Sequence, residues 1–335
     1  TSTQVKALSA SQLQALSMEA VAALDTDAVA ALGTAQVGAL TTEQVRSLTN
    51  AQIDALTSTQ VKALSAAQVK ALEAYDVGAL KGSFQSTQVQ ALTDSQLTTL
   101  GTDVNALTNG QVRALTAGQM AAMAYTQVQA LTTAQVRALG GSQIAALTGG
   151  QVAAMEVADL QALDTTQLGS LTAGQMQYLS ETQVQSLSST QVRALSTAQL
   201  GAVLGNLSDT QVSTLTTTQV RALGTDQLQS LTTTQLGALS QTQLRALSAS
   251  QLAVVRDVAA AADIAELSTD QIANLSNAEL QSLTSRQINA LNSDQVQALS
   301  NTQIGLIATK LTQMGDLSLS QVGSLDFSTL KNIQV

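Results

Sequence analysis

The sequence contains no cysteine and no histidine, and these two absences remove much of the chemistry that proteins use. Without thiols or imidazoles, the chain has no soft metal ligand, no thiol nucleophile and no imidazole base. Tryptophan and proline are also missing, and aromatic residues make up 1% of the chain. The three tyrosines and two phenylalanines are too sparse to predict a carbohydrate-stacking platform. We therefore expect no enzymatic activity, no metal site and no cofactor.

Charge is scarce as well, and it is unbalanced. Asp, Glu, Lys and Arg together form 11% of the chain, and the formal net charge is -9. An acidic chain is repelled by phosphate groups, so nucleic acid and anionic membrane surfaces are disfavoured partners. No apolar run approaches the roughly 20 residues that span a bilayer, which argues against membrane insertion.

What fills the chain is one motif of eight residues, Thr/Ser-x-x-Gln-Val-x-Ala-Leu, which we call the octad. The octad occurs cleanly at residues 1–8, 57–64, 132–139 and 216–223. A unit this short cannot carry a catalytic site in each copy. The repetition therefore predicts a single elongated architecture instead of separate domains.

Three structures have a repeat of this length, and the residue types favour one of them. A continuous helix would rotate the Val/Leu face by about 80° per octad, so no apolar seam would persist. A β-solenoid remains an alternative, although Gln, Ala and Leu prefer helix. The favoured fold is all-α, a solenoid of very short N-capped helices with one helix per octad.

Each octad carries two helix-start signals. Thr or Ser at position 1 with Gln at position 4 forms the capping box, in which each side chain bonds the backbone N–H of the other residue. The Leu before the cap and the Val at position 5 form the hydrophobic staple. In three representative octads the box residues are Thr41, Gln44, Thr132, Gln135, Thr216 and Gln219, and the staple residues are Leu40, Val45, Leu131, Val136, Leu215 and Val220.

A helix this short is unstable alone, so successive helices must stack and share a core of Val, Leu and Ala. Basic residues at position 6 often recur 24 residues apart, as in Arg113 and Arg137 or Arg221 and Arg245. This spacing favours three octads per coil over two, although duplication of a sequence block would produce the same pattern.

The repeat extends over residues 1–325, with longer helices expected near 251–267 and 304–311. The segment Lys81–Phe84 reads as a four-residue insertion, and 101–107 is one residue short, so both predict local kinks or small loops. Residues 326–335 abandon the octad and are expected to form a C-terminal cap or tail. The first octad has no visible cap before it, so we expect this end to pair with another subunit or with further sequence.

The octads resemble the octapeptide-repeat regions (ALTTxQVxAL-like) of large secreted or surface proteins of Gram-negative bacteria. The resemblance covers nearly the whole chain, and it implies an extracellular or cell-surface protein with a structural or adhesin-like role.

These observations lead to a functional hypothesis. The chain is expected to be a non-enzymatic extracellular structural protein that associates with itself into a filament, sheath or surface layer. The alternative is an adhesin stalk or binding module that presents another domain, with possible polysaccharide or cell-surface contacts. Ice binding through threonine triplets such as Thr216-Thr217-Thr218 is a third hypothesis.

Overall fold

The computed structural model describes residues 1–258, 267, 269–283, 287–288 and 290–314. All regular elements in these ranges are helices, and no strand occurs among them. The all-α prediction is confirmed, and the β-solenoid alternative is wrong. Contacts divide the chain into two units, Thr1–Ser186 and Leu187–Val335.

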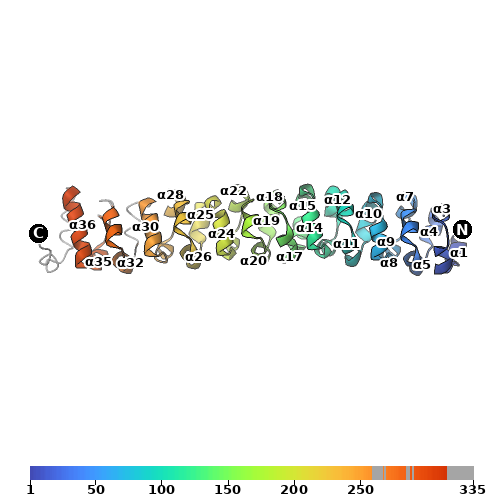
Figure 1. Cartoon of the computed structure of the whole chain (residues 1–335), viewed down its shortest axis with the longest axis horizontal. Helices are drawn as coiled ribbons and strands as arrows, with labels where there is room; N and C mark the ends of the chain where they lie inside the picture. The colour runs from blue at the N-terminus through green and yellow to red at the C-terminus, as the bar shows by residue number, and fades with distance from the viewer. Residues whose placement is uncertain (259–266, 268, 284–286, 289, 315–335) are drawn as a thin grey trace. The chain divides into compact units, whose positions relative to one another are not determined.

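The first unit contains short helices that follow one another in chain order (Figure 1). Its elements are α1 (Ser2–Lys6), α2 (Ala10–Gln14), α3 (Met18–Ala22), α4 (Thr26–Ala30), α5 (Thr34–Ala39), α6 (Thr42–Arg46), α7 (Asn50–Asp54), α8 (Ser58–Ala63), α9 (Ala66–Ala71), α10 (Ala74–Leu80), η1 (Lys81–Ser83), α11 (Ser86–Ala91), α12 (Asp94–Thr99), η2 (Gly101–Ala106), α13 (Asn109–Ala114), α14 (Ala117–Ala122), α15 (Tyr125–Ala130), α16 (Thr133–Ala138), α17 (Gly141–Ala146), α18 (Gly149–Ala154), α19 (Val157–Ala162), α20 (Thr165–Gly169), α21 (Ala173–Met176) and α22 (Glu181–Gln185).

The second unit repeats the same design and adds longer helices. Its described elements are α23 (Ser189–Ala194), α24 (Thr197–Val203), η3 (Leu204–Asn206), α25 (Asp209–Thr214), α26 (Thr217–Ala222), α27 (Thr225–Gln229), α28 (Thr233–Gly237), α29 (Gln241–Leu244), α30 (Ala249–Val258), α32 (Thr269–Ala273), α33 (Asn277–Ser282), α35 (Ser293–Gln297) and α36 (Asn301–Met314). The expected helix at 304–311 falls within α36. The expected helix near 251–267 is present as α30 up to Val258, while 259–266 and the expected tail at 326–335 lie outside the described residues.

Each element packs most closely on the third element after it. In the first unit α2 contacts α5, α13 contacts α16, and α15 contacts α18. Three elements therefore make one coil, as the 24-residue spacing of basic residues predicted. Within a coil, the junction between helices is extended and forms a corner, with ψ of 135° at Leu131 and 139° at Leu139, far from the values of a continuing helix.

The core is a column of position-5 and position-8 side chains. Val45 and Val220 are fully buried, and Leu40, Leu131 and Leu215 are nearly so. The methionines at these positions, Met120, Met123, Met155 and Met176, are buried too and fill the column. Position 7 carries the small Ala, so neighbouring coils approach closely.

The four-residue segment Lys81–Phe84 is not a loop. It forms η1, contacts α8, and buries Phe84 at 4% exposure, so it occupies one full place in the coil. The segment supplies only the second half of an octad, and we call it a half-octad. In the second unit the half-octad 204–207 contains η3 and buries Leu204 and Leu207.

The short octad 101–107 also fills one place, as the 3₁₀ helix η2 that contacts α15. Gly101 begins it with φ at 51°, a left-handed conformation that glycine adopts without the strain that a Cβ would cause. The predicted kinks are therefore regular members of the stack, because a turn of 3₁₀ helix still presents apolar side chains to the core: Phe84 in the first segment, and Val104 and Leu107 in the second.

Candidate functional site

The structure places the predicted box residues together in each representative octad. The Thr132 N–H donates to Gln135 Oε1 at 2.8 Å, and the Gln135 N–H donates to Thr132 Oγ1 at 3.3 Å. Thr41 with Gln44 and Thr216 with Gln219 form the same reciprocal pair. Asp25, Asp164 and Asn292 replace the cap hydroxyl, and their side chains accept the same backbone bond. The helix starts in these octads are therefore locally satisfied.

The amide nitrogen of the position-4 glutamine makes hydrogen bonds that the octad pattern did not predict. Gln135 Nε2 donates to the backbone carbonyls of Val104, at 3.0 Å, and Leu107, at 2.7 Å. These carbonyls belong to the end of an element in the preceding coil, where few backbone acceptors have partners within the helix, although the Val104 carbonyl also accepts the Leu107 N–H at 3.1 Å. One buried side chain thus satisfies a donor in its own helix and acceptors in another coil.

The same bonds recur along both units, and we call the series the glutamine ladder. In the first unit Gln44 reaches Leu13 and Leu16, and Gln151 reaches Met120 and Met123. In the second unit Gln243 reaches Val212 and Leu215. The partners lie 28 to 31 residues apart in regular coils and 24 to 27 where a half-octad intervenes, as for Gln88 with Val61 and Leu64.

In the first unit, two octads with a buried aspartate at position 4 break the ladder between coils. Asp76 and Asp159 occupy position 4, and Glu73 and Glu156 occupy the cap position. Both aspartates are buried, at 4% and 3% exposure. A carboxylate has no N–H to donate to the preceding coil, so these two interfaces lack the bonds that Gln makes elsewhere.

Burial changes the titration of both groups. Loss of hydration raises the pKa of Asp76, while the backbone hydrogen bond from Glu73 opposes the rise and the charge of Glu73 adds to it. Burial likewise raises the pKa of Asp159, against a hydrogen bond from the Thr133 side chain and together with the charge of Glu156. Burial therefore shifts both groups toward the neutral acid relative to an exposed aspartate.

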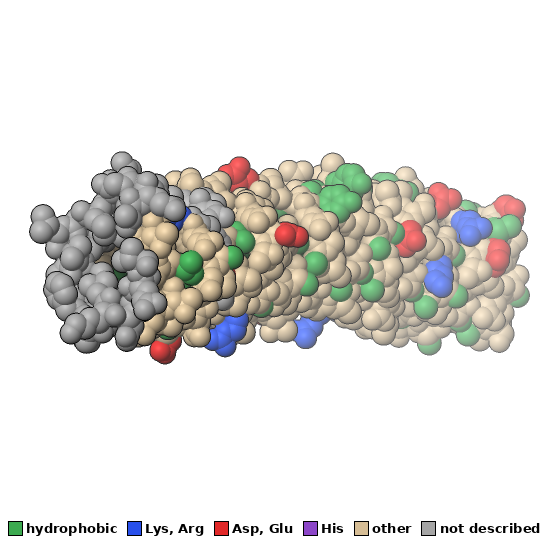
Figure 2. Space-filling view, turned by 60° about the vertical axis from the view of Figure 1, so that its left-hand side comes forward, with side chains coloured by type: hydrophobic (Ala, Val, Ile, Leu, Met, Phe, Trp, Pro, Cys, Tyr) green, Lys and Arg blue, Asp and Glu red, His purple; other side chains and the backbone are tan. Residues whose placement is uncertain are grey.

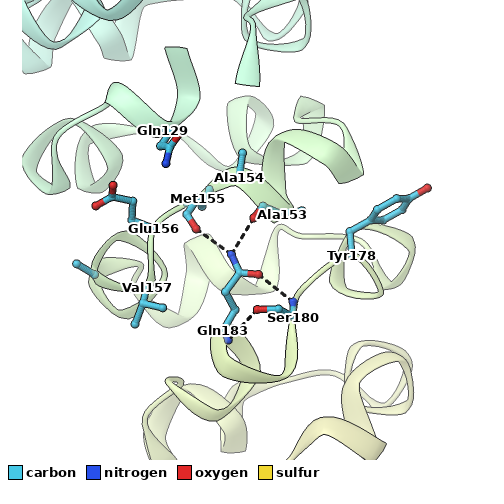
Figure 3. Close-up of a pocket in the computed structure, with 10 residues that line it drawn as sticks. Gln129, Ala153, Ala154, Met155, Glu156, Val157, Tyr178, Ser180 and Gln183 are labelled. Carbon is cyan, nitrogen blue, oxygen red and sulfur yellow. Dashed lines mark hydrogen bonds between the residues drawn. The ribbon is translucent and has the colours of Figure 1, made fainter. Parts of the chain in front are cut away.

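A surface depression of about 650 Å³ lies beside the break at Asp159. Residues from three coils line it, including Gln129, Glu156, Tyr178 and Ser180. Figure 3 shows Glu156 and Gln129 on one side of Met155 and Tyr178 on the other. On its floor, Gln183 Nε2 donates to the carbonyls of Ala153, at 3.1 Å, and Met155, at 2.8 Å. The depression is thus lined by polar groups, and these hydrogen bonds hold the backbone at its floor.

Tyr125 and Tyr178 flank one Gly-Gly peptide at this depression. A Cβ added to Gly149 would lie 2.3 Å from Tyr178 Cδ2, and one added to Gly150 would lie 3.0 Å from Tyr125 Cε1. Both rings therefore lie against bare backbone. They are 61% and 60% exposed, respectively, so their outer surfaces face solvent.

Other chemistry is absent from the described part of the chain. No group of three or more potential metal-binding side chains occurs there, and no helix there is long and apolar enough to cross a bilayer. In the space-filling view of Figure 2, acidic and basic side chains are scattered singly over the described surface. The ion pair found in these ranges joins Lys81 and Asp103 at 3.1 Å.

The ALTTAQ repeat matches four stretches of the sequence, residues 19–50, 120–157, 152–189 and 264–301. These stretches carry the ALTTAQ repeat. The resemblance to a repeat-protein family is thereby confirmed, and two of the four matches overlap at the depression beside Glu156. A comparison with curated proteins finds no match.

Proposed function

We propose that this ALTTAQ-repeat chain is a non-enzymatic extracellular structural protein of a bacterium that associates with itself into a filament, sheath or surface layer. The observation that supports this proposal is the polarity of the glutamine ladder. Every coil presents amide donors toward the preceding coil and carbonyl acceptors toward the following one. The two sides of a coil are therefore complementary, and one copy can continue the stack of another.

Two glutamines identify where such a contact would form. Gln4 and Gln12 lie in the first coil of the chain, and their Oε1 atoms accept from the cap residues Thr1 and Ser9. Their side chains are exposed. Their Nε2 groups can donate to the terminal carbonyls of a helix in a second copy, as Gln36 donates to those of Val5 and Leu8 within the chain.

Electron microscopy and light scattering of the purified protein test the proposal. Wild-type protein should form ordered assemblies, and the double variant Gln4→Leu/Gln12→Leu should form fewer because it lacks the ladder donors. Gln90→Leu is the matched control, since Gln90 is an exposed position-6 residue outside the ladder. A discrete wild-type monomer under all conditions tested would contradict self-assembly.

The second candidate function is a binding module or adhesin stalk. The observation that favours it is the exposed pair Tyr125 and Tyr178 beside a polar depression. A chain whose surface is otherwise built from small polar side chains has no structural need for exposed rings at one place. Detection of a specific ligand for this surface, in protein that stays monomeric, would favour this candidate over assembly.

A further inference from the structure

We infer that the Tyr125–Tyr178 surface is a binding site for a neutral polysaccharide, and this inference rests on the second candidate function, the binding module. The site consists of the two rings, the Gly149-Gly150 peptide between them and the depression that holds Gln129 and Glu156. From the sequence alone, the tyrosines are too sparse to predict such a platform. The sequence gives no sign that the coils bring residues of α15, α18 and the end of α21 onto one face.

The glycines make the platform. Gly149 lies so close to Tyr178 that a Cβ would approach Cδ2, Cε2 and Cγ to within 2.3 to 2.7 Å. Gly150 lies beside Tyr125 Cε1, Cζ and Oη, with corresponding distances of 3.0 to 3.1 Å. Most octads have a side chain at these two positions; one at position 149 would displace the Tyr178 ring, and one at position 150 would crowd the Tyr125 ring. The pair therefore holds two aromatic rings in place with little loss of side-chain entropy on binding.

An exposed tyrosine ring offers an apolar face with a polar tip. A sugar ring is complementary to it, because its axial C–H groups form an apolar face while its hydroxyls radiate around the edge. Two such rings, from the coils on either side of α18, suit a chain of sugars better than a single sugar. A polysaccharide can rest on both rings and extend over the depression.

The depression supplies partners for the hydroxyl groups. Glu156 stands at a cap position, yet its side chain makes no cap hydrogen bond, unlike Thr132 in the regular octad. Gln129 is exposed at position 6 of its octad. Their carboxylate and amide can accept from and donate to sugar hydroxyls without giving up a bond within the fold.

Charge selects a neutral sugar. The position-6 residues along this face, Gln129, Ala153 and Gln177, carry no charge, while Glu156 carries a negative one. The arginines at the same position, Arg113 and Arg137, belong to α13 and α16, which form a different side of the coil from the Tyr125–Tyr178 surface. With a net charge of -9 on the whole chain, an anionic polysaccharide would be repelled.

Affinity electrophoresis tests the site with four probes, hydroxyethyl cellulose, β-1,3-glucan, xylan and galactomannan, each cast into a native gel. Wild-type protein should be retarded in at least one gel. Tyr125→Ala and Tyr178→Ala should each weaken binding roughly tenfold, the effect of about 1.4 kcal/mol for one lost stacking contact. The double variant should migrate as in a gel without polysaccharide.

Tyr75→Ala is the matched control, because Tyr75 is also exposed, at 48%, but its hydroxyl bonds Asp54 and it lies on another coil. It should bind like wild type. Gly149→Val adds a separate test, since it displaces the Tyr178 ring without removing it and should weaken binding. Circular dichroism of each variant shows that the helices are intact.

The inference is overturned if no probe retards the wild type, if the double variant still binds, or if Tyr75→Ala weakens binding as much as Tyr178→Ala. The same variants examined by electron microscopy separate this result from the assembly proposal. Filaments with no sugar binding refute the site alone, and sugar binding with no filaments refutes assembly alone.

Discussion

The octads Thr132–Leu139 and Glu156–Leu163 differ at the cap and at position 4, among other positions, and consequently in what they bond. The first has Thr at its cap and Gln135 at position 4, and it bonds both its own helix start and backbone carbonyls of the preceding coil. The second has Glu156 and Asp159 at these positions, and Asp159 has no amide to donate to those carbonyls. The apolar positions of both are equally buried, with Val136 at 1% and Leu160 at 0% exposure. The apolar core therefore persists without the ladder, and the break leaves polar groups for other uses.

The largest expected effect comes from removing the ladder at the regular octad. Gln135→Leu keeps the side-chain volume but leaves the Thr132 N–H and the Leu107 carbonyl without their side-chain partner, while the Val104 carbonyl loses one of two bonds and keeps the one from the Leu107 N–H. Each such group costs about 1–3 kcal/mol when buried, so we expect a loss of roughly 3 kcal/mol. Amide hydrogen exchange of residues 104–107 and 132–139 measures it locally, which suits a repeat stack better than a global transition.

Gln90→Leu is the control for this change, since the Gln90 side chain is exposed and lies outside the ladder. Its exchange rates should stay within error of the wild type. Equal protection of residues 104–107 in Gln135→Leu and the wild type would show that the ladder contributes nothing to coil pairing.

Restoring the ladder should have the opposite and somewhat smaller effect. Asp159→Gln supplies an amide at the place from which other glutamines reach the preceding coil, here the carbonyls of Val128 and Leu131. Two added hydrogen bonds of about 1 kcal/mol each predict a gain of roughly 2 kcal/mol. The midpoint of guanidinium denaturation should rise, whereas Asp159→Leu, which cannot bond, serves as the matched variant. A fall in the midpoint for Asp159→Gln would mean that the break has its own stabilising contacts.

A smaller effect is expected at the cap. Glu156→Thr introduces the hydroxyl that the other octads use, and good caps contribute about 1 kcal/mol. Thr132→Ala should cost about the same amount at the regular octad. Thermal denaturation of the two variants measures both changes in stability. A stability gain in Glu156→Thr without a loss in Thr132→Ala would show that the cap hydroxyl does not stabilise every helix start. Sugar retardation of Glu156→Thr tests its second role in the same protein.

The smallest effect concerns pH. The pKa values of Asp76 and Asp159 are raised in the fold, so the native state binds protons more tightly than the unfolded chain. Their contribution is favourable below the unfolded pKa of about 4 and is lost as pH rises through the folded pKa. The double variant Asp76→Asn/Asp159→Asn should therefore gain on the wild type as pH increases across this window. Melting temperatures from pH 3 to pH 7 test the sign, and a constant difference would exclude the linkage.

The sequence predicted the parts of the fold that depend on neighbours within one octad. Thr132, Gln135 and Val136 lie within a few residues of each other, so their capping and staple roles can be derived from spacing alone. The coil interface depends on partners 28 to 31 residues away, such as Val104 and Leu107 for Gln135, and the octad pattern contains no signal for them. The one available hint was that most octads have Gln at position 4. Glu at this position would cap the helix as well, but its side chain could not donate a hydrogen bond to the preceding coil.

The depression could not be predicted for a related reason. Tyr125 and Tyr178 are distant in the sequence, and only the three-element coil places them beside Gly149 and Gly150. The same ignorance of coil geometry led to the wrong prediction of a kink or loop at Lys81–Phe84.

The half-octads show how such a chain can change length. Because Lys81–Phe84 fills the place of eight residues with four, the gain or loss of the first half of an octad leaves the core column and the order of the coils unchanged. Such an event removes one cap and one ladder rung, and nothing beyond them. A gene of this kind can therefore gain or lose four codons as well as eight, and the encoded protein keeps its stacked fold.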